Sequence, residues 1–345
     1  MTKVAICVCT YGRPPQLDRL LKELADQRWK QLGEPSITVV VVENDAGGVA
    51  EEVCLKHIAS NRLSIIYSLE PRPGVAITRN RCIEIAAQFS EFIAFIDDDE
   101  LPAKDWLEQL MLLQQTTEAD VVAGKILGRY LNPPPSWLVG TPIHDTGPPV
   151  AADGSTWGRS VRRLLHPFPA LASVASGTRV DWCDTGNVLL RTDIVRRGFR
   201  FDETIGHLGY GTDTLFFRQV ARSGYKIVWS NEAVAYHEIP PERTTAAWFI
   251  RRSLQQGFCT VVVESRFRCR ATRRMKIVFF ALTAFVDVMS GLAWAFVNAT
   301  VAAVSLIADR RRYVWHMSEA AWGLGRCAGI LGMTVRYNRR AASPT

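Results

Sequence analysis

The sequence predicts an α/β fold in which helices cover both faces of a largely parallel sheet. Four short, β-rich apolar runs alternate with longer segments whose apolar residues recur at helical spacing. Such alternation is typical of βαβ units, and the strands of a parallel sheet are apolar throughout because both faces are buried. The apolar runs lie at 3–9, 37–42, 63–68 and 92–96, and the helical segments at 14–27, 49–59 and 75–89.

Composition is that of a globular protein, with 48% hydrophobic and 22% charged residues in a chain of 345. The opening "MTKVAICVCTYGRP" enters a strand pattern at once and lacks the basic segment and long apolar core of a signal peptide. Eight scattered cysteines without a C-x-x-C pair predict reduced core thiols of a cytosolic protein, not a zinc site or a disulfide framework.

The net charge of +7 is concentrated from residue 266 onward, where 13 Lys and Arg face three acidic residues. These basic residues flank the apolar stretch 277–307, so they indicate a membrane surface and not a nucleic acid. With Asp287 as its single charge, the stretch is long enough for a bilayer span. Basic residues on both sides favour a cytoplasmic re-entrant or hairpin segment, with one tilted span or a buried helix of a soluble domain as alternatives.

Residues 313–333 could form an interfacial amphipathic helix that carries Trp315, Trp322 and Leu331. Between the two halves of the chain, 128–180 is too rich in Pro and Gly for regular structure. Regular patterning resumes afterwards. Strands are expected at 186–190, 226–229 and 233–236, and helices at 212–223 and 244–257.

An unusual carboxylate cluster, "FIDDDE", ends the fourth apolar run. Strand alternation places Asp97 and Asp99 on one side of the backbone and Asp98 on the other. Adjacent carboxylates repel one another unless a cation neutralises them, and Mg²⁺ or Mn²⁺ prefers such oxygen ligands together with substrate phosphates. The alternative is a solvated acidic turn that caps a helix starting near Lys104.

The three preceding strands also end in polar loops punctuated by Gly or Pro. These loops read "TYGRP" at 10–14, "ENDAGG" at 43–48 and "RPGVAITRN" at 72–80. Ligands of parallel sheets bind outside the carboxyl ends of the strands. The loops therefore predict a nucleotide site, with acids for base and ribose groups and arginine for phosphate oxygens.

With these motifs in this order, residues 3–257 resemble the family 2 glycosyltransferases, and most closely bacterial exopolysaccharide enzymes of the succinoglycan-glucosyltransferase type. The resemblance implies the A-type nucleotide-diphospho-sugar transferase fold, with a Rossmann-like mixed sheet. The motifs that carry it are "CTYGRP", "VVENDAGG", "GVAITRN", "FIDDDELP", "DTGNVLLR", "GYGTDTLFFR" and "AVAYHE".

The resemblance implies a role for each matching residue. The uridine pocket would be lined by Thr10, Tyr11, Arg13 and Glu43, with Asp45 close by. Arg79 would approach the base or the diphosphate, and Asp97 and Asp98 would serve the ribose and the donor sugar. The donor or acceptor sugar would lie near Asp181, Trp182, Asp184, Gly186 and Asn187, although Trp182 could instead pack in the core.

The implied metal ligands are Asp99 and His237, for Mn²⁺ or Mg²⁺, although a lone histidine is often structural. The implied catalytic base is Asp213, which could instead only cap its helix. This chain has Thr212 before that aspartate, where the family usually shows glutamate. The departure puts the acceptor geometry in doubt.

The sequence thus predicts an inverting, metal-dependent glycosyltransferase at the cytoplasmic face of a bacterial inner membrane. It would move a sugar from a UDP-sugar to a lipid-linked saccharide. The catalytic domain would span 1–262, with a nucleotide-binding half at 1–125 and an acceptor half at 126–262, and a membrane-associated tail at 263–345. A non-catalytic carbohydrate-binding protein and a metal-dependent phosphohydrolase with "DDDEL" as its nucleophile loop are the alternatives.

Overall fold

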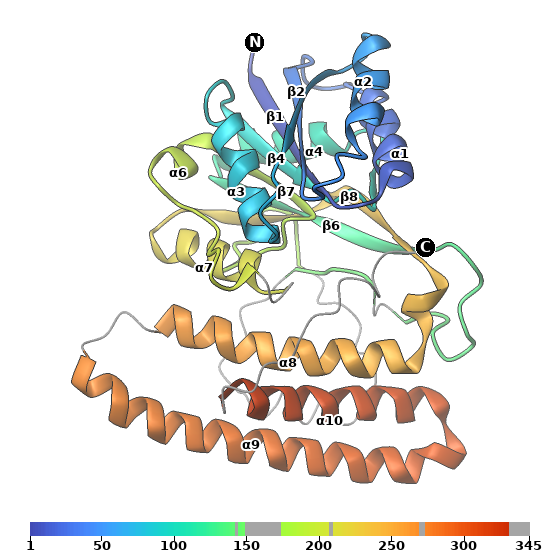
Figure 1. The fold of residues 1–345 in the computed structure, drawn as a ribbon, viewed down its shortest axis with the longest axis vertical. Helices are drawn as coiled ribbons and strands as arrows, with labels where there is room; N and C mark the ends of the chain where they lie inside the picture. Colours follow the sequence, from blue (N-terminus) through green and yellow to red (C-terminus); the bar gives the residue numbers. More distant parts are fainter. Residues whose placement is uncertain (142–143, 149–173, 207–209, 269–272, 331–345) are drawn as a thin grey trace.

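The computed structural model describes residues 1–141, 144–148, 174–206, 210–268 and 273–330. One eight-stranded mixed sheet, in the order β3-β2-β1-β4-β7-β6-β8-β5, forms the centre of the upper part in Figure 1. Its first four strands are parallel: β1 (Lys3–Thr10), β2 (Ser36–Glu43), β3 (Ser64–Leu69) and β4 (Phe92–Ile96). The mixed half contains β5 (Glu100–Pro102), β6 (Val121–Tyr130), β7 (Asn187–Arg191) and β8 (Ile227–Ile239). The predicted Rossmann-like mixed sheet is confirmed.

Helices bury their apolar stripes on both faces of this sheet. One face carries α1 (Pro14–Ala25), α2 (Glu51–Ala59) and α4 (Trp106–Thr117), whose side chains pack on Val39 and Val41. The other face carries α3 (Val75–Ala86), α6 (Thr192–Arg196) and α7 (Thr212–Arg222), packed on Val40 and Val42. Successive residues of β2 thus face opposite cores, as the pleat requires, and the two cores hold the strand ends in place.

The chain changes position in the sheet immediately after β4. Residues 97–99 carry it away from the parallel half, and β5 then pairs antiparallel with β8 at the sheet edge. In this register Glu100 lies opposite His237. The aspartate turn and the histidine, 138 positions apart in the sequence, therefore come together because of this crossover.

Two expectations for the mixed half need correction. The strands predicted at 226–229 and 233–236 form one strand, β8, with an irregularity where β6 changes register between Ala123 and Lys125. Strand β6 was not predicted, because its N-terminal part precedes the Pro- and Gly-rich segment that dominates the local pattern. The other predicted helices and strands before residue 257 are present with shifted ends.

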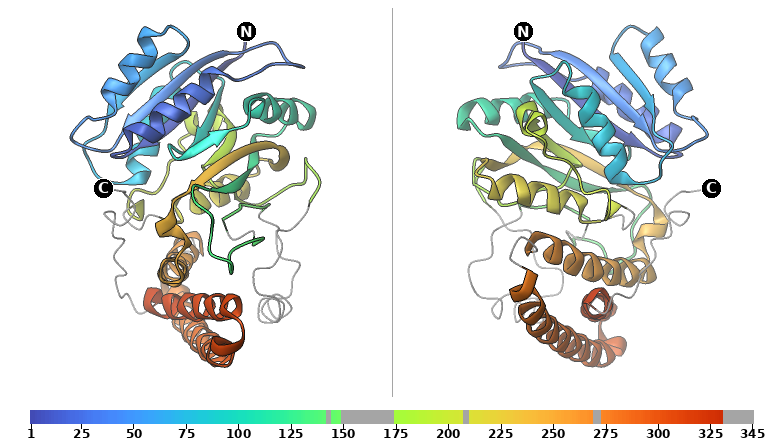
Figure 2. Two further views of the ribbon diagram at one scale, coloured as in Figure 1. Left: turned by 90° about the vertical axis from the view of Figure 1, so that its right-hand side faces the viewer. Right: turned by 60° about the vertical axis from the view of Figure 1, so that its left-hand side comes forward.

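Three long helices stack on the side of the sheet domain away from the N-terminus (Figures 1 and 2). They are α8 (Ala246–Arg268), α9 (Arg273–Ala308) and α10 (Arg310–Ile330), and α10 packs against both others. Helix α8 contacts α7 through Phe258, Cys259 and Val263. The proposed boundary after residue 262 falls inside α8, and the division into domains stays a prediction.

The predicted hairpin within 277–307 is wrong, because one unbroken helix, α9, contains the whole stretch, and the chain turns back only between α9 and α10. The interfacial helix expected at 313–333 is also misplaced. It corresponds to α10, which lies between α8 and α9, and its Trp315 is buried against Trp137 and Phe249. Leu331 lies outside the described residues.

Candidate active site

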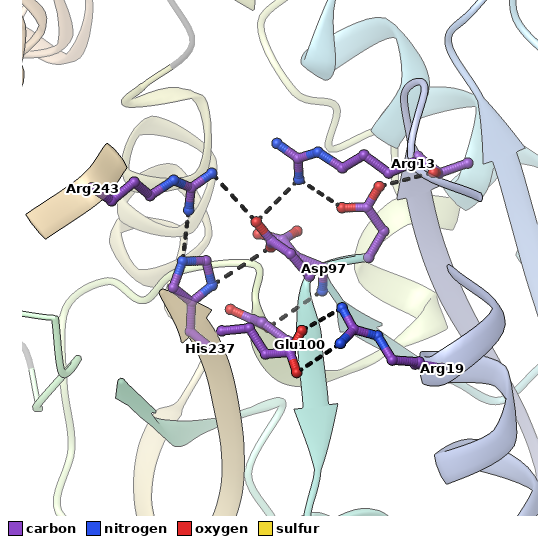
Figure 3. Close-up of polar contacts among 10 residues, drawn as sticks. Arg13, Arg19, Asp97, Glu100, His237 and Arg243 are labelled. Atoms are coloured by element: carbon purple, nitrogen blue, oxygen red, sulfur yellow. Dashed lines mark hydrogen bonds and ion pairs between the residues drawn. The ribbon is translucent and has the colours of Figure 1, made fainter. Parts of the chain in front are cut away.

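The site is built around the three aspartates that follow β4 (Figure 3). Asp98 is buried, and its carboxylate accepts hydrogen bonds from Thr10 Oγ1 at 2.8 Å and from Arg13 Nη1 at 2.9 Å. Thr10 ends β1, and Arg13 precedes α1, so the aspartate ties the first loop to the β4 turn. Burial, together with the charge of Asp99, raises the pKa of Asp98 to about 7.

Asp99 faces the other way, toward β8 and the segment that follows it. Its Oδ2 lies 3.0 Å from Arg13 Nη1 and 3.5 Å from Arg243 Nη2, and its Oδ1 lies 3.5 Å from His237 Nδ1. Burial acts to raise the pKa of Asp99, but the nearby His237 and the positive charges of Arg13 and Arg243 favour the ionised form and lower the pKa below its usual value. Asp99 is therefore the carboxylate of the cluster that stays ionised most readily.

Asp97 and Glu100 complete the acidic turn. The Asp97 carboxylate accepts no hydrogen bond from a side chain in the described parts of the chain. Glu100 is buried beneath it and accepts the backbone N–H of Asp97 at 3.3 Å. Burial raises the pKa of both groups. Gly186 makes room for Glu100, since a Cβ at that glycine would lie 2.5 Å from Glu100 Oε1.

A second acidic pair, Asp184 and Asp213, lies close enough to Asp97 for their charges to interact. Burial and then the charges of Asp213 and Asp97 raise the pKa of Asp184 to about 7. Asp213 stands in the first turn of α7, and its Oδ1 accepts the Thr214 N–H at 2.8 Å. The helix cap itself is Gly211, at φ +87°, so Asp213 is not the N-cap residue.

The departure at Thr212 has a structural counterpart. The buried guanidinium of Arg79 donates from Nη1 to Thr212 Oγ1 at 2.9 Å and lies over the Phe201 ring. A hydroxyl partner leaves the positive charge of Arg79 uncompensated at this contact, whereas a glutamate would neutralise it. The charge instead lowers the pKa of Asp97 and Asp184, against the larger opposing effect of burial.

The loops after β2 and β3 form the side of the site next to the first loop, and this side is called the wall below. Glu43 has no exposed surface, and its oxygens accept the Ala50 N–H at 3.1 Å and the Tyr67 hydroxyl at 2.6 Å. Asn44, which sequence reasoning missed, holds the next loop through the Gly74 N–H and two carbonyls. Asp45 is partly exposed and lies next to Gly12 of the first loop. Glu43 thus supports this wall from within.

Asn187 belongs to the core, and its predicted sugar contact needs revision. Its Oδ1 accepts Trp106 Nε1–H at 2.7 Å, and its Nδ2 donates to the carbonyls of Lys125 and Ala233, both at 2.9 Å. With 2% of its surface exposed, it ties β7 to β6 and β8. Trp182 is half-buried and, with Asp184, lines a small cavity beside it.

Three more predicted residues, Asp181, Tyr11 and His237, differ in how far they are exposed. Asp181 and Tyr11 are exposed, so both are accessible to a ligand. His237 is 20% exposed in its side chain, and burial lowers its pKa, which keeps the imidazole neutral. Arg243 was missed, although it follows His237 by six residues in "HEIPPER". Its contact with the site depends on the turn after β8, which the sequence does not encode in any recognisable motif.

Asp99 and His237 fit a divalent cation that a substrate also helps to bind. Adjacent ligands of an octahedral ion with bonds of about 2.1 Å lie about 3 Å apart, close to the 3.5 Å between Asp99 Oδ1 and His237 Nδ1. Among the residues that the structure describes, no third His, Cys, Asp or Glu completes a metal cluster with them. Mg²⁺ and Mn²⁺ are commonly bound by one or two carboxylates together with substrate phosphates.

Comparisons with known proteins identify the family and the fold of this chain. The family model described as "Glycosyl transferase family 2" matches residues 5–184. Succinoglycan biosynthesis protein ExoM of Rhizobium meliloti is 29% identical over 255 residues, which cover 74% of this chain and 72% of that protein. Glucosyl-dolichyl phosphate glucuronosyltransferase of Haloferax volcanii is 22% identical over 279 residues, covering 76% of this chain and 77% of its own.

Among solved structures, the mannosyltransferase PcManGT from Pyrobaculum calidifontis, in complex with GDP-Man and Mn²⁺, matches with a TM-score of 0.57. The match covers 95% of this chain and 87% of that one at 16% identity. The mixed sheet is that of an A-type glycosyltransferase. The chain belongs to glycosyl transferase family 2.

Proposed function

We propose that this glycosyltransferase moves a sugar from a UDP-sugar to a lipid-linked saccharide with inversion at the anomeric carbon, assisted by Mn²⁺ or Mg²⁺. One observation carries the proposal. In this family 2 chain, Arg13, Asp97–Asp99 and His237 come together beside the end of β4. The phosphohydrolase alternative loses its support, since the aspartate loop follows β4 instead of the first strand.

The donor would bind across the ends of β1, β2 and β4. Thr10, Tyr11, Arg13 and Asp45 line the proposed uridine pocket, and Glu43 stabilises its wall. The proposed partners of ribose and donor-sugar hydroxyls are Asp97 and Asp98. The Asp97 carboxylate accepts no hydrogen bond from a described side chain. Arg79, with only a hydroxyl partner at Thr212, can direct its charge toward the diphosphate side of the site.

Asp99 and His237 are the proposed metal ligands. A divalent ion held there would neutralise the charge that builds up on the departing diphosphate. The neutral imidazole of His237 and the readily ionised carboxylate of Asp99 have the protonation states that metal ligands require.

Asp213 is the proposed base. It would remove the proton of the acceptor hydroxyl as that oxygen attacks the anomeric carbon, while the bond to the diphosphate breaks. A single displacement of this kind inverts the anomeric configuration. Asp184, whose pKa of about 7 lies near physiological pH, would bind the acceptor hydroxyl or share its proton. Asp181, Trp182 and Gly186 complete the proposed sugar-binding wall.

The names of two relatives support a polysaccharide pathway, and one of them supports a lipid-linked acceptor. The Rhizobium protein is named for succinoglycan biosynthesis, and the Haloferax enzyme is named as acting on a glucosyl-dolichyl phosphate. The PcManGT complex contains GDP-Man, so the uridine preference of this chain rests on its own resemblance to exopolysaccharide enzymes. Tests of the proposal therefore include donors with both bases.

The distribution of apolar and polar side chains on α9 supports contact with a membrane, on the side of the three long helices that faces away from the sheet. Its residues Val288–Leu306 form the one helix of the described chain that is long and apolar enough to cross a bilayer, with a mean hydropathy of 1.5. Phe296 is 75% and Val304 77% exposed on its outer face. The polar Asn298 points inward and pairs with His316 of α10. Apolar groups outside and polar groups inside reverse the pattern of a soluble bundle.

We therefore propose that α9 lies in the plane of the inner membrane, at its cytoplasmic face. Helix α10 packs along α9 and carries Glu319 and Arg326, so a spanning α9 would draw these charges into hydrocarbon at considerable cost. An in-plane helix buries only its outer face. Arg310 and Arg312, which are exposed in the first turn of α10, would contact anionic headgroups.

The stereochemistry of the product tests the proposed reaction. Purified protein is incubated with Mn²⁺, an α-linked UDP-sugar and a lipid-linked saccharide, and the new linkage is examined by proton NMR. A β-linked product supports direct displacement. An α-linked product would exclude Asp213 as the base of a single displacement, and no turnover with any UDP- or GDP-sugar would favour a carbohydrate-binding protein.

A further inference from the structure

Arg243 makes its closest polar contact with a proposed metal ligand. Its Nη1 lies 2.7 Å from His237 Nε2, and its Nη2 lies 3.5 Å from Asp99 Oδ2 (Figure 3). The side chain is 17% exposed and extends from the short helix Pro241–Thr244 that follows β8. One guanidinium therefore bridges both residues proposed to bind the cation.

This contact fixes the tautomer of the histidine. A guanidinium can only donate, so His237 Nε2 must accept, and the ring proton sits on Nδ1. The one lone pair that this tautomer leaves on the ring is therefore engaged by Arg243. Coordination through Nδ1, the nitrogen nearest Asp99, would move the proton to Nε2, where it would face an Arg243 N–H. With either nitrogen, the cation and Arg243 exclude one another at His237.

We propose that Arg243 is a built-in competitor for the cation site, which the incoming metal–donor complex displaces and which then binds the donor diphosphate. This inference rests on the proposed nucleotide-sugar site. Leaving Asp99 and His237 deprives the guanidinium of a carboxylate, and the diphosphate brings negative charge to the same place together with the cation. Arginine suits phosphate oxygens because its planar fork donates two parallel hydrogen bonds.

The proposal couples the two ligands in a defined way. Mn²⁺ alone must displace Arg243 without providing it with a new partner, so it binds weakly. A nucleoside diphosphate together with Mn²⁺ provides that partner, so the pair binds cooperatively. The arrangement would keep the site from holding a cation in the absence of donor.

The test measures Mn²⁺ binding by electron paramagnetic resonance in the full-length protein, without a sugar donor, and then UDP binding at saturating Mn²⁺ by calorimetry. Arg243→Gln should bind Mn²⁺ at least about fivefold more tightly than the wild type, the lower end of typical coupling between two ligands. The same variant should bind UDP with Mn²⁺ at least about fivefold more weakly. Opposite changes in the two affinities are the signature of a displaced competitor.

Arg19→Gln is the matched control. Arg19 pairs with Glu238, the neighbour of His237 on β8, so its loss removes the same charge nearby without freeing a metal ligand. Equal tightening of Mn²⁺ in both variants would reduce the effect to general electrostatics and overturn the proposal. If Arg243→Gln does not fold, Arg243→Lys, whose single ammonium cannot bridge Asp99 and His237, should change both affinities in the same directions.

Two further outcomes separate this inference from the metal site itself. In the first outcome, Asp99→Asn abolishes Mn²⁺ binding, but Arg243→Gln leaves it unchanged or weakens it. This result would overturn the proposal that Arg243 competes with the cation, while the metal site would remain supported. Absence of Asp99-dependent Mn²⁺ binding in wild type and Arg243→Gln alike would overturn both.

Discussion

Replacing Asn187 with alanine should lower the stability of the protein and leave the affinity of the site for sugar unchanged. The side chain fills one position in the sequence motif "DTGN", but its amide is entirely used inside the protein. The substitution leaves the Trp106 indole N–H and the carbonyls of Lys125 and Ala233 without their partner. The two carbonyls belong to β6 and β8, and the indole belongs to α4, so the amide joins β7 to three neighbouring elements.

The size of the effect follows from those contacts. A buried polar group left unsatisfied costs about 1–3 kcal/mol. Three such groups, with partial relaxation, should lower the free energy of unfolding by about 3–6 kcal/mol. At this chain length each kcal/mol moves the melting temperature by roughly 2 °C, so the midpoint should fall by about 6–12 °C.

The assay is thermal unfolding followed by circular dichroism, with UDP-sugar affinity measured well below the midpoint. Asp184→Asn, three residues earlier, is the control. At pH 8 it removes a buried charge whose pKa is about 7, so it should melt no lower than the wild type, yet transfer slowly. An Asn187→Ala variant that melts like the wild type but loses donor or acceptor affinity would restore the sugar contact that the sequence predicted.

Three more predictions concern the base, the aspartate cluster and the membrane face. Asp213→Asn should bind UDP-sugar normally and lose about 10²–10⁴ in turnover, since a general base contributes that much; retention of a tenth of wild-type turnover would place the base elsewhere. Because burial raises the pKa of Asp98 from 3.8 to about 7, its contribution to stability is complete below pH 4 and is lost as pH rises through 7. In EDTA the wild type should therefore melt lower at pH 8 than at pH 5.5, and Asp98→Asn should show a smaller difference. Glutamate at both Phe296 and Val304 should reduce cosedimentation with anionic vesicles, whereas Leu55→Glu, at an exposed site on α2, should not.

The parallel half of the fold was predictable from the sequence because its signals are local. Each strand from β1 to β4 is a short apolar run, and each following helix has its own periodicity. The mixed half was harder. Strand β5 has three residues and exists only by pairing with β8, so no local pattern identifies it. The position of the sheet edge is a tertiary property.

The candidate site shows the same division. Residues at strand ends, such as Asp98 and Thr10, converge as expected because parallel strands end at one edge. Asn187 matches a motif, but packing buries it. Arg243 reaches the site only because a turn after β8 brings it back to Asp99. Sequence reasoning locates chemistry along the chain, whereas burial and turns decide which groups remain available to a ligand.

The central claim is that the Asp97–Asp99 turn and His237 form a metal-dependent site for a nucleotide-sugar donor. Sugar transfer from a panel of UDP- and GDP-sugars, measured as nucleoside diphosphate release with Mn²⁺ and again in excess EDTA, tests it most directly. Wild-type protein should turn over at least one UDP-sugar with Mn²⁺ and stop in EDTA, and Asp99→Asn, which keeps the shape of the side chain, should be nearly inactive with Mn²⁺. Full turnover in EDTA, or by Asp99→Asn, would contradict the claim.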